Sequence, residues 1–340
     1  MAQHHIVKPG FLHDEKGRLI EPGYATNLIQ TYDRKRIAAN PLRIKEWDYY
    51  YIGNDNFGLA LTIADNGYMS MDSISLLDFE HGWEQTTSRM GVLPLGKRKL
   101  PPTSECGDIH VKGKDYEMTF KNDGVKRSLF GSMENFRDGK PIVFDVELRN
   151  APRDSMVIVT PFKEDPKAFY YNQKINCMRA SGWIKFDGKK YEFDPKSDFG
   201  TLDWGRGVWT YDNTWFWGSG NADVDGNSFG WNIGYGFGDT SAASENILFW
   251  NGKAHKLDDV TFNIPESGYM DTWTFTSSDS RFEMTFEPVL DRAANLDFKV
   301  IVSDQHQVFG KMSGKAVLDD GTEINIKDVM CFAEKVHNKY

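Results

Sequence analysis

Residues 198–246, DFGTLDWGRGVWTYDNTWFWGSGNADVDGNSFGWNIGYGFGDTSAASEN, hold five of the chain's 10 tryptophans and ten of its 31 glycines. Over residues 229–238, bulky side chains occupy the odd positions and glycine or asparagine the even ones, which is the period of a β-strand. A similar alternation covers residues 215–222, and Asp225-Gly226 between the two runs is a hairpin signal. We therefore expect two antiparallel strands with one aromatic face and one bare glycine face, a pattern that favours a walled cavity.

Short alternating runs and turn dipeptides continue through most of the chain. Glycine follows aspartate or asparagine between apolar stretches at Asp123, Asp138, Asp187, Asn251 and Asp320. Short strands joined by such turns are typical of a β-barrel or sandwich, whereas βαβ units would need amphipathic helices that the sequence lacks. The runs that we expect to be strands include residues 48–52, 57–63, 116–120, 142–148, 156–159, 247–250, 273–275, 282–286, 298–302 and 308–318.

The pattern predicts a mostly β protein of two antiparallel β-barrel or sandwich units packed together. The chain has 340 residues, which is long enough for two ordinary domains. We expect residues 1–175 to form the N-terminal unit and residues 176–340 the C-terminal unit with the hairpin. Residues 24–40 are the exception to the β pattern, because apolar residues fall near one face and Pro41 closes the run, so we expect one short N-terminal helix there. No linker separates the units, so a ligand site would lie between or within them.

The composition limits the classes of partner that the protein can bind. The formal net charge is -9 and the basic residues are scattered along the sequence, which predicts neither a nucleic-acid partner nor an anionic-membrane partner. No stretch approaches the roughly 18 apolar residues of a membrane span, so we expect no membrane insertion, and the N-terminus has no run of signal-peptide type. Cys106, Cys177 and Cys331 lie far apart without a CxxC pair, which fits reduced thiols in a cytoplasmic protein.

Asp203 is the first candidate for chemistry. A carboxyl group beside Trp204, in a segment this aromatic, is the arrangement that raises a carboxyl pKa by desolvation and yields a general acid. Arg206 would either pair with Asp203 or bind an anionic group of a substrate. The alternative is a structural turn, in which the aspartate accepts backbone hydrogen bonds and the arginine is its ion-pair partner.

Three further groups of polar residues are candidates. Asp239, Glu245 and Asn246 follow the aromatic strand, where acid/base partners would sit at a barrel mouth. The glycines before them alternate along a strand and no lysine follows, which disfavours a phosphate loop. The second group is Tyr171, Asn172 and Lys174, which would offer a hydroxyl, an amide and an ammonium group to the same cavity. The third is the carboxylate of Asp48, among the rings of residues 46–50. Ordinary loop and edge-strand residues would look the same.

The motifs that would indicate a cofactor are missing. The eight histidines show no HxH or HExxH spacing, so we expect no zinc or iron site. Residues 223–227 lack the downstream glutamate of a calcium loop, and no GxSxG, Walker or Rossmann motif is present. We expect carboxylates, tyrosines and rings to do any chemistry without a cofactor.

Several motifs resemble a known superfamily. Asp203-Trp204-Gly205 leading into Trp215-Phe216-Trp217-Gly218, with Asp320-Gly321 and the Phe332-Ala333-Glu334-Lys335 segment, resembles the lipocalin-type superfamily that contains carotenoid 1,2-hydratases and AttH-type proteins. The chain is most similar, over nearly its whole length, to an uncharacterised bacterial branch marked by residues 44–50, 170–174 and 236–239. The resemblance implies two lipocalin-like barrels with a cavity, in a superfamily that protonates alkenes, cyclises prenyl chains or carries lipids. The hydratases usually have Asp-His-Trp, whereas here Asp203 directly precedes Trp204 and Arg206 lies nearby, which favours an anionic or hydroxylated ligand.

We therefore expect a cofactor-independent acid/base enzyme that adds or removes water, or cleaves a glycosidic bond, in a tryptophan-lined pocket. Aromatic walls with carboxylates suit glycans as well as prenyl or lipid-like molecules. Asp203 would be the proton donor, Glu245 or Asp239 the base and Arg206 the substrate anchor. The expected walls and further contacts are Trp204, Trp215, Trp217, Trp231, Tyr171, Asn172, Lys174, Asn246 and Asp48. The alternative is a non-catalytic carrier of a lipid or other small amphipathic molecule, and a purely structural partner protein is disfavoured.

Overall fold

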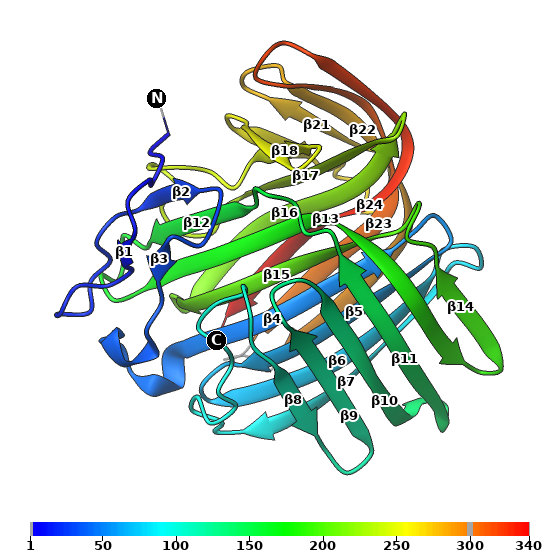
Figure 1. Ribbon diagram of the computed structural model, residues 1–340, viewed down its shortest axis with the longest axis horizontal. Helices are drawn as coiled ribbons and strands as arrows, with labels where there is room; N and C mark the ends of the chain where they lie inside the picture. Colours follow the sequence, from blue (N-terminus) through cyan, green and yellow to red (C-terminus); the bar gives the residue numbers. More distant parts are fainter. Residues whose placement is uncertain (1–2, 298–301, 340) are drawn as a thin grey trace.

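The computed structural model describes residues 3–297 and 302–339, and these form two curled antiparallel sheets (Figure 1). Within the described residues the larger sheet has 13 strands. Its main path runs in the order β7 (Trp83–Val92), β6 (Met69–Asp78), β5 (Phe57–Asp65), β4 (Ile44–Gly53), β15 (Phe199–Val208), β13 (Phe169–Phe186), β11 (Lys140–Arg149), β10 (Arg127–Arg137), β9 (Tyr116–Asn122) and β8 (Ile109–Lys112). β12 (Met156–Pro161) and β14 (Lys189–Phe193) pair with β13, and β2 (Gly23–Ala25) pairs with β12.

The smaller sheet has nine strands among the residues described. Its order is β19 (Lys253–Lys256), β18 (Ile247–Trp250), β17 (Asn227–Tyr235), β16 (Asp212–Val224), β24 (Glu323–Lys339), β23 (Val302–Val317), β22 (Phe282–Asp297), β21 (Trp273–Ser277) and β20 (Val260–Asn263). The mostly β prediction is confirmed. The strand expected at 298–302 lies largely outside the described residues.

The predicted hairpin is β16–β17. Val224 pairs with Asn227 across the two-residue turn, in which Asp225 has a φ of 52° and Gly226 a φ of 79°. Two central residues with positive φ are what a type I′ turn requires, and this turn matches the right-handed twist of the paired strands. The Asp-Gly dipeptide therefore fixes the register of β17 against β16, the strand that carries Trp215 and Trp217.

Each sheet wraps around its own apolar core, and a third apolar cluster joins the two sheets. On β4, Tyr50 and Ile52 belong to the core of the larger sheet, whereas Tyr49 and Tyr51 belong to the third cluster, together with Trp217, Phe309 and Phe332. Successive side chains of a strand point to opposite faces. The two half-barrels therefore meet through the faces that point away from their own cores.

The expected N-terminal helix is absent. Residues 24–40 contain part of β2, then β3 (Gln30–Thr31), which pairs in parallel with β1 (Gly10–Phe11), and the short 3-10 turn η1 (Arg34–Arg36), with a second turn, η2 (Pro41–Arg43), following. Tyr24 pairs with Ile158 of β12, and the Tyr32 hydroxyl donates to Glu46 at 2.8 Å. These tertiary contacts override a weak local helical pattern.

The expected division between residues 175 and 176 falls inside β13. The chain leaves the larger sheet at Val208 and enters the smaller one at Asp212. β13 has a bulge between Ile175 and Met178, so it continues across the expected boundary as a bent strand. In the described part of the chain, no helix combines the length and the apolar character that crossing a bilayer would require.

A substitution at Gly220 would test how the hairpin packs. A Cβ atom at this position would overlap the ring of Trp231, which is fully buried in the core of the smaller sheet. We expect Gly220→Ala to lower the free energy of unfolding by about 1–3 kcal/mol, because overpacking forces the ring off its rotamer. Urea denaturation measures the change. Gly10→Ala is the control, since a Cβ atom there meets nothing within 4 Å. Equal stability of the two variants would contradict this placement of Trp231.

Candidate functional site

A cavity of about 610 Å³ lies between the two sheets. Its walls come from β4, β5, β6, β7, β13 and β15 of the larger sheet and from β16, β17, β22, β23 and β24 of the smaller one. The volume is in the range of small-molecule sites. The rings that line it are Trp47, Tyr49, Tyr68, Tyr170, Trp209, Trp215, Phe216, Trp217, Tyr235 and Phe237.

A buried ion pair projects from the larger sheet into this cavity. Lys174 on β13 and Asp203 on β15 are cross-strand partners, and the Lys174 Nζ atom lies 2.9 Å from Oδ1 of Asp203. Asn172 Nδ2 donates to the same oxygen at 2.6 Å, and the Lys174 ammonium lies 4.0 Å from the centroid of the Trp217 ring. Lys174 is 3% exposed, so it supplies the counter-charge that a buried carboxylate requires.

Glu334 reaches the cavity from the smaller sheet. It is the cross-strand partner of Trp217, and its two carboxylate oxygens accept hydrogen bonds from Trp215 Nε1 at 3.0 Å and Gln307 Nε2 at 2.9 Å. Burial raises the pKa of Glu334 to about 7, although the hydrogen bond from Trp215 and the charge of Lys174 oppose the shift. The side chain can therefore both carry and release a proton near neutral pH.

Glu245 is a second buried carboxyl group in the cavity wall. Burial raises its pKa, while the charge of Lys174 acts in the opposite direction and that of Asp203 in the same direction. Burial raises the pKa of the Tyr170 hydroxyl well above its usual value, and the charge of Glu245 adds to the shift, so this hydroxyl remains a donor. Asp203, Glu245 and Glu334 thus form one electrostatic group around Lys174.

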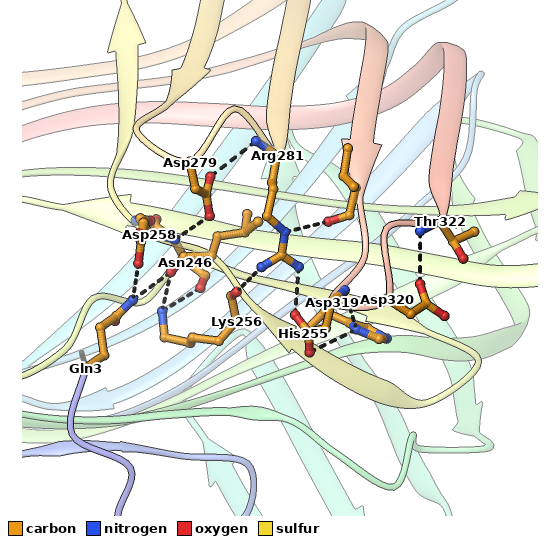
Figure 2. Close-up of polar contacts among 12 residues, drawn as sticks. Gln3, Asn246, His255, Lys256, Asp258, Asp279, Arg281, Asp319, Asp320 and Thr322 are labelled. Carbon is orange, nitrogen blue, oxygen red and sulfur yellow. Dashed lines mark hydrogen bonds and ion pairs between the residues drawn. The ribbon is translucent and has the colours of Figure 1, made fainter. Parts of the chain in front are cut away.

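Polar contacts hold the chain at Asn246, the residue that follows Glu245 (Figure 2). Lys256 Nζ donates to Ser244 Oγ at 3.0 Å and to the Asn246 carbonyl at 2.6 Å, so the residues on both sides of Glu245 are fixed. Asn246 Nδ2 donates to the Asp258 carbonyl at 2.9 Å. Burial lowers the pKa of Lys256 to about 7. Asn246, expected to contact a substrate, instead holds this segment in place.

Five of the residues predicted from the sequence line the cavity, and these are Asp203, Glu245, Lys174, Trp215 and Trp217. Asn172 contacts the cavity only through its hydrogen bond to Asp203. The remaining predictions lie elsewhere, and the reason is the same for most of them: neighbouring positions on a strand face opposite sides.

Trp204 and Arg206 occupy the opposite face of β15 from Asp203. Trp204 lies in the core of the larger sheet, and the fully buried Arg206 donates through Nη2 to Asp48 at 3.1 Å and to the Pro101 carbonyl at 2.7 Å. Burial raises the pKa of Asp48, and the charge of Arg206 opposes this shift. Arg206 and Asp48 are therefore partners in the protein interior rather than a substrate anchor and a pocket carboxylate.

Three other predicted residues also lie away from the cavity lining. The Tyr171 hydroxyl donates to the Gln30 carbonyl at 2.7 Å, so its neighbour Tyr170 is the tyrosine that faces the cavity. Trp231 lies in the core of the smaller sheet, although Tyr235, at the end of the same face of β17, lines the cavity. Asp239 forms an ion pair with Lys163 at 3.4 Å.

Several lining residues were not found by sequence reasoning. Trp47 and Tyr49 flank Asp48 and would have followed from choosing the other face of β4. Glu334 and Gln307 lie more than 100 positions from Asp203 in the sequence, and only the pairing of β16 with β24 and of β24 with β23 brings them together. No local pattern signals such a contact.

One group in the described residues has the donor atoms for a metal ion. Ligand atoms of Asp78, Glu80 and His81 lie within 4.8 Å of one another. The carboxylate of Asp78 already accepts hydrogen bonds from Lys189 at 3.2 Å and Tyr191 at 3.1 Å, so ordinary protein contacts satisfy it. Asp78 and its neighbours do not line the cavity between the sheets.

Comparison with known proteins supports the superfamily resemblance at the level of the fold. A Nitrosomonas europaea protein provisionally assigned as an AttH matches with a TM-score of 0.56 and 12% identity, over 93% of this chain and 99% of that one. Kievitone hydratase from Nectria haematococca matches with a TM-score of 0.53 and 13% identity, over 97% and 98% of the two chains. No curated protein matches significantly. The model of DUF2804, a domain family of unknown function, matches residues 3–340, and the chain therefore belongs to this family.

Proposed function

We propose that this protein is an acid/base enzyme that adds water to, or removes it from, a small amphipathic molecule bound between the two sheets. The observation that carries the proposal is the buried Lys174–Asp203 pair, which shares an aromatic cavity with Glu334, a carboxyl group whose pKa is about 7. A group with this pKa is suited to proton transfer near neutral pH. The rings suit a flat or apolar body, and the polar groups suit its hydroxyls.

In the proposed reaction Glu334 is the proton donor and Asp203 the base. This assignment replaces Asp203 as donor, because Lys174 and Asn172 supply positive charge and a hydrogen bond to the Asp203 carboxylate, whereas burial favours the protonated form of Glu334. In hydration, Glu334 gives its proton to one carbon of a double bond, and the water that bonds to the other carbon gives a proton to Asp203. The proton returns to Glu334 through water, and dehydration follows the same steps in reverse.

The experiment is a turnover screen in oxygen-labelled water. The wild-type protein is incubated with hydroxylated aromatic, prenyl and glycan compounds, and mass spectrometry detects the gain of one labelled water. We expect Asp203→Asn and Glu334→Gln to lower turnover by at least about 100-fold, the range of general acid–base catalysis. Asp239→Asn is the matched control and should keep wild-type turnover, because Asp239 pairs with Lys163 away from the cavity lining.

Two results would overturn the proposal. Full turnover by Asp203→Asn would show that the Lys174–Asp203 ion pair takes no part in the reaction. A compound retained in native mass spectrometry, but never converted, would instead identify a carrier with the same cavity. A product of glycosidic cleavage in the screen would keep the acid/base roles but change the reaction.

The raised pKa of Glu334 also has a consequence for stability. Folding raises this pKa from 4.5 to about 7, so the folded state binds more protons than the unfolded state between these values, and stability falls as pH rises through this window. Glu334→Gln removes this dependence. Between pH 5 and pH 7.5, we expect the free energy of unfolding of the variant to gain about 1–3 kcal/mol relative to wild type. Urea denaturation at both pH values measures it, and parallel pH profiles would contradict the shift.

A further inference from the structure

A loop with exposed apolar side chains lies beside the cavity. Met90 at the end of β7 lines the cavity and is 65% exposed, so the cavity reaches the surface at this residue. The last residue of β7, Val92, is 87% exposed, and Leu93 and Leu95 in the loop that follows are 52% and 36% exposed. Contiguous exposed aliphatic residues are unusual on a monomeric protein and mark interaction sites.

The backbone holds these leucines outward at an energetic cost. Leu93 and Leu95 each have a φ of 50°, a left-handed conformation that branched apolar residues rarely adopt. Backbone hydrogen bonds fix the loop to the turn that carries cavity residue Tyr68: Leu93 N donates to the Tyr68 carbonyl at 2.9 Å, and Leu95 N donates to the Gly67 carbonyl at 3.2 Å. The apolar surface is thus preformed and rigidly attached to the cavity wall.

The fold adds positive charge to the same place. Lys97 and Lys99 are exposed and follow the apolar residues directly. The guanidinium of Arg34 fills the space beside Gly96, which brings residues 34–36, with the exposed Lys35, against the loop. Residues 34–36 and 97–99 are far apart in the sequence, but the folded chain brings them together. Arg34 and Arg98 form ion pairs with Glu46 and Asp72, so the exposed lysines carry the positive charge of this surface. The net charge of -9 therefore hides a local cationic surface.

We propose that Val92, Leu93, Leu95, Lys35, Lys97 and Lys99, together the rim loop surface, dock on a membrane that carries anionic lipids, so that the cavity opens at the bilayer. Aliphatic side chains enter the boundary between headgroups and acyl chains, and lysines near an anionic surface strengthen the binding electrostatically. A protein partner fits less well, because protein interfaces are depleted in lysine and enriched in aromatic residues and arginine. The proposal goes beyond the acid/base chemistry and requires none of the cavity carboxylates.

The test is cosedimentation of the full chain with vesicles of phosphatidylcholine alone or mixed with phosphatidylserine. We expect binding only to the mixed vesicles, weakening as salt increases. The triple change Val92→Asn, Leu93→Asn and Leu95→Asn should reduce binding at least about tenfold. Asparagine tolerates positive φ, so the changes at Leu93 and Leu95 keep the loop conformation. The double change Lys97→Gln and Lys99→Gln should also reduce binding about tenfold or more, by removing two of the cations.

Matched controls lie elsewhere on the surface. Val125 is 76% exposed in the turn between β9 and β10, and Lys311 and Lys327 are exposed on β23 and β24. Val125→Asn, and Lys311→Gln with Lys327→Gln, should bind like wild type. Absence of wild-type binding, or equal losses in the control variants, would overturn the proposal. So would a concentration-dependent dimer that the triple asparagine variant abolishes, because the rim loop surface would then bind a second copy of the chain.

Discussion

The ion pair between Lys174 and Asp203 is the interaction on which the rest of the site depends. Removing two charges from water costs several kcal/mol for each ion. The attraction between the buried charges offsets this cost only if they lie close together and make further hydrogen bonds. Here the two residues are neighbours on paired strands, Asn172 donates to the carboxylate, and the Trp217 ring contacts the ammonium. The charges of this pair then act on Glu245 and Glu334 across the cavity.

The strands around the cavity have two apolar or aromatic faces, and each face has a separate role. On β15, Trp204 packs in a core while Asp203 faces the cavity. On β16, Trp215 and Trp217 contact the cavity and the cluster between the sheets, whereas Phe216, which also lines the cavity, packs against the core of the smaller sheet. A strand in the centre of a molecule buries both faces. The same strands therefore provide the stability of each half-barrel and the shape of the ligand site.

This burial of both faces also explains how far the sequence could predict the structure. Alternation identified the β class and the hairpin, and it placed Asp203, Lys174 and two tryptophans at a cavity. It could not decide which face of β13 or β15 the cavity uses, since both faces are buried and both carry polar residues, and so Tyr171 and Arg206 were chosen together with Lys174 and Asp203, of which only the last two line the cavity. Glu334 depends on pairing between distant strands, and the short N-terminal helix was displaced by contacts with β12 and Glu46 that leave no local trace.

The cavity walls are divided between two sheets, so a truncated protein that contains one sheet would lack part of the site. Lys174 and Asp203 belong to the larger sheet, while Glu245 follows β17 and Glu334 lies on β24 of the smaller one. A fragment that contained either half-barrel alone would hold an incomplete set of these ionisable groups, open to solvent on the side where the other half was removed. The proposed acid/base chemistry therefore depends on the contact between the two half-barrels, because loosening that contact would separate Glu334 from Asp203.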